Sequence, residues 1–158
     1  GGEKMSVEQK FEPVELAEAV RDLLVGKAVE AGLEINAIIV GTPREAIPEA
    51  EYFPLVVVEL EGGDNRLVAA QRYEQSYRFR VHYIARNESG RNNAFFVWQG
   101  ARRMADILES EPKLSGAVCL GQVNDLRCNE PTAYAVPEAG GHVTGASVGY
   151  RCWRKVLC

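Results

Sequence analysis

The chain has 158 residues, of which 46% are hydrophobic and 25% charged, and its formal net charge is −4. These proportions are typical of a globular domain and exclude a disordered, collagen-like or coiled-coil chain. At this length a single domain buries roughly 70% of the surface that its unfolded chain exposes, so its stability requires neither a disulfide nor a metal.

The amino-terminal residues predict a polar lead ahead of the domain. Residues 1–12 are polar and acidic, which predicts a flexible segment and no secretory signal, and Gly1 and Gly2 resemble a cloning remnant. A single domain is expected over residues 13–158. No apolar run in the sequence approaches the roughly 18 residues that cross a membrane, so we expect a soluble cytoplasmic domain with no membrane partner.

Charge is distributed unevenly along the chain. Residues 1–63 carry 5 basic and 13 acidic side chains, whereas residues 64–103 carry 8 arginines and 3 acidic side chains. Internal pairing accounts for this pattern. A molecule with opposite charges on opposite edges also accounts for it, and such a molecule suits head-to-tail self-association. The acidic net charge disfavours binding to nucleic acid, which requires a basic surface.

The first part of the chain predicts a helix followed by two strands. Pro13 suits the first turn of a helix, and apolar residues repeat at helical spacing from there to Gly32, a natural stop. A short strand is expected at 35–41, followed by a proline-interrupted loop at 42–53. A strand rich in β-branched residues is expected at 54–61 and a turn at 62–65. After this turn, residues 67–71 can extend a hairpin arm.

The clearest strand covers residues 72–86. Alternating positions give one aromatic and apolar face (Tyr73, Tyr77, Phe79, Val81, Tyr83) and one polar face (Glu74, Ser76, Arg78, Arg80, His82). Such alternation predicts an antiparallel strand with one face on the core and the other in water. On this interpretation His82 is a surface residue, and the arginines pair with acids rather than bind nucleic acid.

The remaining segments predict a helix and two strands. The helix, at 94–111, has an apolar side that predicts core packing: Ala94, Val97, Trp98, Ala101, Met104, Ala105 and Leu108. Strands are expected at 117–129 and 143–156, joined by a loop at 131–142. This order predicts an α+β fold with a largely antiparallel (mixed) sheet of about five strands and two main helices packed on one face.

The cysteines give little support for a chemical site. Cys119, Cys128, Cys152 and Cys158 include no CxxC spacing, so we predict neither a zinc site nor a disulfide framework. We interpret them as small buried residues of the carboxyl-terminal strands, with one loose terminal thiol. A nucleophile formed by Cys119 or Cys128 with His142 is the least favoured alternative.

Catalytic constellations are equally hard to find. The sequence has no GxGxxG, GxxxxGK[ST] or HExxH motif. Glu59 and Glu61 share a strand face, either as juxtaposed acids or as solvated or Arg-paired carboxylates. We therefore predict no enzyme activity, no catalytic residue, no cofactor and no metal.

The succession of segments resembles the tail terminator (tail completion) proteins of long-tailed bacteriophages. An amphipathic helix leads to the strand FPLVVVELEG and then to the long strand RYEQSYRFRVHYIAR. An Asn-rich loop, the helix NNAFFVWQGARRMADILES and two closing strands follow, so that the likeness runs from Pro13 to Val156.

The resemblance implies a non-enzymatic protein of the virion tail or neck that assembles in the host bacterial cytoplasm. Members of that family form hexameric rings that cap the tail tube, stop its polymerisation and present a surface to the head–tail connector. The implied partners are therefore other copies of the chain, the tube protein and the connector. Genome DNA passes through the ring without specific binding, so we expect a neutral or acidic lumen.

The arginine-rich middle and two loops supply the candidate contact residues. We predict subunit or tube contacts for Arg78, Arg80, Arg86 and Arg91. The loops at 62–71 and 131–142 are expected to become ordered on docking, and they add Asp64, Arg66, Tyr134 and Glu138. Two alternatives stay open: another neck protein that joins tail to head, and a dimeric domain that binds a small ligand in a pocket lined by the aromatic strand.

Overall fold

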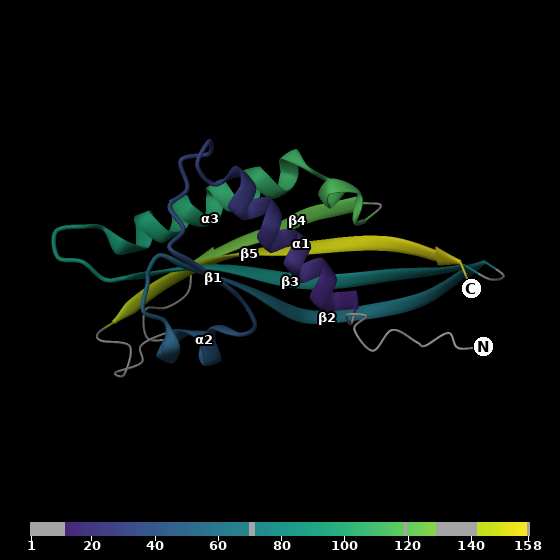
Figure 1. Cartoon of the computed structure of the whole chain (residues 1–158), viewed down its shortest axis with the longest axis horizontal. Helices are drawn as coiled ribbons and strands as arrows, with labels where there is room; N and C mark the ends of the chain where they lie inside the picture. The colour runs from purple at the N-terminus through teal and green to yellow at the C-terminus, as the bar shows by residue number, and fades with distance from the viewer. Residues whose placement is uncertain (1–11, 70–71, 119, 129–141, 158) are drawn as a thin grey trace, which may run out of the picture.

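The computed structural model describes residues 12–69, 72–118, 120–128 and 142–157 (Figure 1). Its helices are α1 (Glu12–Lys27), α2 (Pro43–Glu49), α3 (Asn93–Ser110) and the 3₁₀ turn η1 (Leu114–Gly116). Its strands are β1 (Ala37–Val40), β2 (Leu55–Ala69), β3 (Arg72–Arg86), β4 (Leu120–Cys128) and β5 (Val143–Leu157). The predicted lead at 1–12 lies outside the described residues except for Glu12, which begins α1.

The five strands form one mixed sheet in the order β1-β2-β3-β5-β4. The edge strand β1 runs parallel to β2, and every other pair of neighbours is antiparallel. The predicted α+β class with about five strands is therefore confirmed. The two free edges of the sheet differ, because β1 has four residues and β4 has nine.

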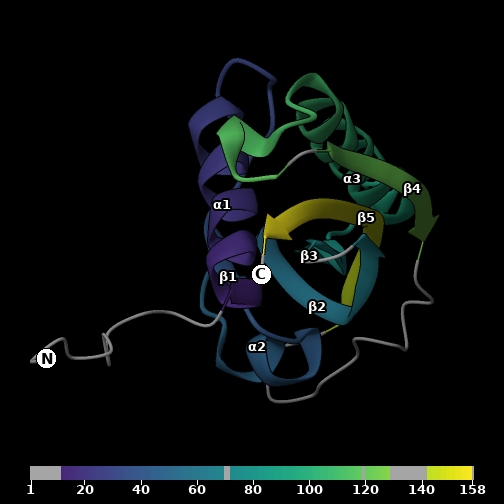
Figure 2. The same ribbon diagram turned by 90° about the vertical axis from the view of Figure 1, so that its right-hand side faces the viewer.

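A single large apolar core lies between the helices and the sheet. α1 contacts β1 and β2, whereas α3 contacts β3, β4 and β5, and Figure 2 shows α1 and β4 on opposite sides of the molecule. Val20 of α1, Met104 of α3 and Phe79 of β3 have no exposed surface in this core. A smaller cluster joins α2 to the opposite side of β2, through Ile47 and Val57.

Two loop predictions are wrong. In each case proline or glycine suggested a loop, but these residues lie in a helix or a strand. The segment 42–53 contains the helix α2, because Pro43 occupies a first-turn position where proline is favoured and the Thr42 hydroxyl accepts a hydrogen bond from the Glu45 amide. The predicted turn at 62–65 is a continuing part of β2, paired with β3 after a bulge. Gly62 and Gly63 make room there for Arg78 and Tyr77, whose side chains would collide with a Cβ at these positions.

The outer ends of three strands form an arm that continues past the helices. We define the outer arm as residues 62–69 of β2, 72–78 of β3 and 151–157 of β5, which pair with one another throughout. Figure 1 shows these strands running to the right of α1 and α3. The arm thus presents sheet surface at one end of the molecule, and α2 lies near the other end.

Candidate functional site

The face of β3 opposite Phe79 and the large apolar core carries a cluster of charged side chains. On β3 this face consists of alternate residues from Glu74 to His82, and its centre is buried: Arg80 is 9% exposed and His82 5%. The prediction that this face lies in water is therefore wrong for its centre. Side chains from β2, β4 and β5, distant in sequence, surround these two residues.

Arg80 of β3 contacts side chains of three other strands, β2, β4 and β5. Its Nη2 atom lies 3.1 Å from Oδ1 of Asp125 on β4, and its Nε atom lies 3.3 Å from Oε1 of Glu61 on β2. Nη1 donates a hydrogen bond of 3.0 Å to Oγ of Ser147 on β5. Gly149 of β5 lies under the Arg80–Asp125 contact, where a Cβ would approach Asp125 Oδ1 to 2.6 Å. Two carboxylates and a hydroxyl therefore fix this guanidinium within the chain.

His82 pairs with Glu59 beside this cluster. The distance from His82 Nε2 to Glu59 Oε1 is 2.7 Å. Burial lowers the pKa of His82, and the hydrogen bond to Glu59 opposes that shift. Glu59 and Glu61 are thus paired with a histidine and an arginine, which agrees with the paired-carboxylate interpretation rather than with juxtaposed acids. The prediction that His82 is a surface residue is wrong.

A motif that the sequence analysis missed runs through the same cluster. Gly145, Ser147 and Gly149 satisfy GxSxG, which in some hydrolases marks a nucleophilic serine on a sharp strand-to-helix turn. Here Ser147 lies in the middle of β5, pairs with His82 across the strands and has no exposed surface. Because no reactant can reach that hydroxyl in this arrangement, the geometry favours a structural network over a nucleophile and its base.

The outer arm carries two neighbouring arginines, of which Arg78 is exposed and Arg151 half-buried. Arg78 of β3 and Arg151 of β5 are direct cross-strand partners, and like charges at such positions repel each other. The side chain of Arg78 is 47% exposed and lies 3.7 Å from Asp64, itself 69% exposed. Arg151 lies over the ring of Trp153, 4.9 Å from its centroid, and its Nε has no hydrogen-bond partner among the described residues. This pair suits a surface that meets acidic groups.

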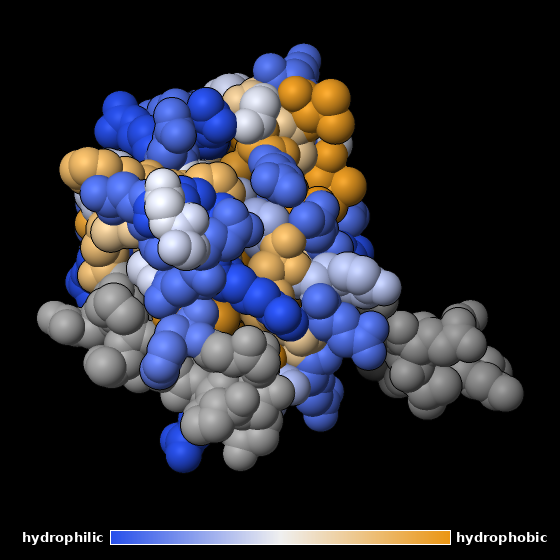
Figure 3. Space-filling model, turned by 90° about the vertical axis from the view of Figure 1, so that its left-hand side faces the viewer, coloured by the Kyte–Doolittle hydropathy of each residue, from blue (hydrophilic) through white to orange (hydrophobic). Residues whose placement is uncertain are grey.

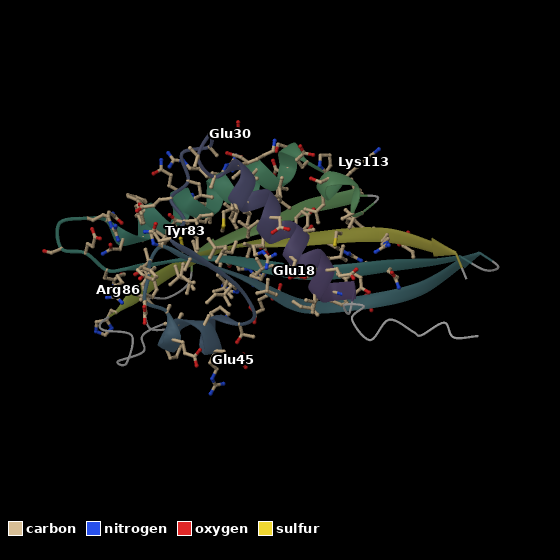
Figure 4. All side chains as sticks on the ribbon, viewed as in Figure 1. Glu18, Glu30, Glu45, Tyr83, Arg86 and Lys113 are labelled. Carbon is tan, nitrogen blue, oxygen red and sulfur yellow. The ribbon has the colours of Figure 1, made fainter. Side chains whose placement is uncertain are left out.

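The other predicted contact residues fall into different settings. Arg80 is fixed internally, so we withdraw it as a contact. Arg91 stabilises the loop before α3. It donates a hydrogen bond of 2.7 Å to the Arg86 carbonyl and one of 2.9 Å to Asn93 Oδ1. Its guanidinium lies 4.0 Å from the centroid of the Phe96 ring. Arg86 is exposed at the end of β3 opposite the outer arm (Figure 4), 4.9 Å from the Phe53 ring centroid.

The loop residues of the prediction are only partly described. The backbone of Arg66 pairs with Glu74 in the outer arm, but its side chain lies outside the described residues. Tyr134 and Glu138, with most of the predicted loop at 131–142, also lie outside them. Asp64 is exposed on the arm rather than in a turn.

Apolar side chains reach the surface at both edges of the helical layer. On one side, α1 and β1 border a groove of about 330 Å³ whose lining includes Val25, Val29 and Ile38. An apolar patch at the upper right of Figure 3 lies on the same side as the carboxyl end of α1. On α3, Phe95 is 73% exposed and Trp98 40%. Ala94 is exposed as well, so the predictions that Trp98 and Ala94 belong to the core are wrong.

The described thiols do not form a reactive site. Cys152 is buried, as predicted, whereas Cys128 is exposed and free. Cys119 and Cys158 lie outside the described residues. His142 is exposed, and its carbonyl accepts a hydrogen bond from the Asn87 amide.

The described residues contain neither a metal-binding group nor a membrane-spanning helix. No group of three or more His, Cys, Asp or Glu side chains there has an arrangement that could hold a metal ion. In the same part of the chain, no helix has the length and apolar character needed to cross a bilayer. No protein-family model matches the chain, and no curated protein matches it either.

Proposed function

We propose that this chain is a tail terminator subunit, which assembles with further copies into a hexameric ring on the end of a phage tail tube. The ring would stop tube growth and offer a surface to the head–tail connector, with no chemical reaction. The proposal extends the resemblance described above, which rests on the order of the chain's helices and strands and on their residue composition.

The observation that carries this proposal is the pair of unlike edges of the sheet. One edge is the four-residue parallel strand β1 beside an apolar groove, and the other is the nine-residue antiparallel strand β4 beside the exposed aromatic residues of α3. A ring requires a heterologous interface, in which one surface of each subunit meets a different surface of the next. Two chemically distinct edges provide such surfaces, whereas a two-fold dimer requires only one.

The outer arm supplies the surface for the tube or connector in this proposal. Its exposed Arg78 and half-buried Arg151 would meet acidic side chains, and its long strands would place that contact away from the subunit interface. Polymerisation would stop because the far side of the ring lacks the surface on which another tube ring stacks. The buried charge cluster around Arg80 would keep the sheet rigid at the base of the arm.

The small-ligand alternative gains no support from the aromatic strand. Phe79 and Tyr83 are 0% and 2% exposed and pack in the core between sheet and helices. Their side chains therefore fill the core instead of lining a pocket. A neck protein that joins tail to head would use the same edges and arm, and it differs from the proposal only in its partner.

A tube-growth assay tests the proposal. A phage tail tube protein from the source of this chain would be polymerised with and without an excess of the chain, and tube lengths would be measured by electron microscopy. We expect shorter tubes that carry an extra ring at one end. Arg78→Glu combined with Arg151→Glu should abolish this effect while leaving self-association intact. Tubes of unchanged length in the presence of excess wild-type chain would contradict the proposal.

A further inference from the structure

The groove beside β1 has the character of a receptor for an apolar side chain. It is lined almost entirely by apolar residues of α1, of the segment that follows it and of β1, and its volume of about 330 Å³ is at the lower end of the range for ligand pockets, about 300 to 1,000 Å³. Val25 is 53% exposed and Val29 93%. Apolar surface so close to a free strand edge is typical of a surface that another protein covers.

The exposed aromatic pair of α3 has the character of the matching ligand. Phe95 and Trp98 are three positions apart and therefore lie on the same flank of a helix with 3.6 residues per turn. They are 73% and 40% exposed, and Arg102, 66% exposed, continues the row one turn later. Trp, together with Arg, is enriched among the residues that dominate binding energies at protein interfaces.

The groove and the aromatic pair lie on opposite flanks of the molecule. Two contacts identify the flank of α3 that faces α1. Arg103 donates a hydrogen bond of 2.7 Å to the carbonyl of Gly32, in the segment that follows α1. On the same flank, the ring of Phe96 lies beside that of Tyr83. At 100° per residue, Trp98 points to the other flank, toward the β4 edge. A single copy therefore cannot fill its own groove.

We propose that Phe95 and Trp98 of one copy of this chain seat in the α1–β1 groove of the next copy. The contact is heterologous, so each copy uses its aromatic pair on one neighbour and its groove on the other, and repetition gives a closed ring or an open filament. The inference rests on the proposed function and deepens it, because it assigns the residues by which subunits meet.

Charge at the two surfaces favours this pairing over a symmetric one. Glu30 and Glu34 are exposed beside the groove; Figure 4 shows Glu30 at the top of the segment that follows α1. Arg102 stands beside the aromatic pair and has only an exposed contact of 3.7 Å with Asp106, which contributes little. Glu30 and Glu34 can thus attract Arg102 of the next copy when unlike surfaces approach, whereas two grooves would bring acidic side chains of both copies together.

Two charged substitutions at highly exposed positions test the contact. Val29→Arg disables the groove and Phe95→Glu disables the aromatic pair, and neither should alter the thermal midpoint of the monomer. Sedimentation equilibrium should show, for each variant alone, a dissociation constant for self-association at least about 30-fold higher than that of the wild type. Tyr52→Glu, at a 64% exposed aromatic residue elsewhere on the surface, should leave it unchanged.

An equal mixture of the two variants distinguishes head-to-tail contact from other kinds of association. The Val29→Arg copy keeps its aromatic pair and the Phe95→Glu copy keeps its groove, so the mixture should form one-to-one dimers and nothing larger. If the wild type self-associates and both variants do so equally well, this contact is wrong and the ring proposal stands. Two variants that stay monomeric when mixed would overturn the head-to-tail pairing. A wild type that never self-associates would overturn the contact and the ring together.

Discussion

The carboxylate of Asp125 on β4 binds the guanidinium of Arg80 on β3, although β5 runs between these two strands. Asp125 accepts hydrogen bonds of 3.1 and 3.3 Å from Nη2, and its Oδ1 also accepts one of 3.2 Å from the Gly149 amide of β5. The contact is possible because Gly149 has no side chain on that face. One carboxylate thereby fixes three strands in register beside the outer arm.

Gly149→Ala should destabilise the fold by about 1 to 3 kcal/mol, the usual cost of forcing atoms into a packed site. The new Cβ would lie 2.6 Å from Asp125 Oδ1 and 3.1 Å from Arg80 Nη2, so the ion pair must separate. Urea denaturation measures the loss. Gly26→Ala is the matched control, since nothing lies within 4 Å of its Cβ, and it should raise stability by about 0.5 to 1 kcal/mol. Equal effects at the two glycines would contradict this account.

Arg80→Ala and Arg78→Ala should differ sharply, although the two arginines are neighbours on one strand face. Loss of Arg80 removes the cation that Glu61 and Asp125 share, although Arg127 Nη2 remains 3.0 Å from Asp125 Oδ2. Removal of one partner from a buried pair costs about 3 to 5 kcal/mol, and the partial exposure of both acids reduces the expected cost to about 2 to 3 kcal/mol. Arg78, 47% exposed, should cost about 0.5 kcal/mol or less. Comparable losses of unfolding free energy would show that the cluster is not structural.

The stability of the wild type should fall as the pH falls below the ordinary pKa of histidine. The pKa of His82 is lowered from 6.5 in the folded chain, so the unfolded chain binds the proton more tightly. This contribution is complete above pH 6.5 and is lost as the pH falls through the folded-state pKa. This loss of stability is measured as the change in the thermal midpoint from pH 8 to pH 5.5, roughly the interval in which histidines titrate. His82→Gln should flatten this dependence of the thermal midpoint on pH. A slope that survives in His82→Gln would assign the effect to another group.

Thiol labelling of the native protein should distinguish the two described cysteines. Cys128 is exposed and Cys152 buried, so Cys128→Ser should remove one equivalent of native labelling and Cys152→Ser should remove none. Mass spectrometry after alkylation counts the equivalents. An unchanged count for Cys128→Ser would mean that its thiol is covered in solution, as it would be at an interface near the end of β4.

Hydrophobic periodicity was sufficient to locate β3 and α3. The alternation from Tyr73 to Tyr83 predicted β3, and the repeat around Met104 predicted α3, because one face of each element packs against a single core. Glycine and proline were less informative. Gly62 and Gly63 act as space for large neighbours, and Pro43 begins a helix, whereas turn propensity alone predicts loops at both places.

The candidate site was less predictable than the fold. Arg80 and Arg78 occupy equivalent positions in the sequence pattern, and only the pairing of β3 with strands much later in the chain makes one of them structural. Trp98 lies at the margin of the apolar stripe of α3. Helical spacing alone does not show whether a tryptophan at such a position is buried or, as here, exposed. The GxSxG spacing around Ser147 was available in the sequence, but its burial within a strand was not.

The most direct test of the proposed ring is the native mass of the wild-type protein over a wide range of protein concentration. Native mass spectrometry should detect a closed hexamer, alone or in equilibrium with monomer, and electron microscopy of the same sample should show rings. A strict monomer at every concentration, with or without the tail tube protein, would contradict the proposal that this chain acts through association with its own copies.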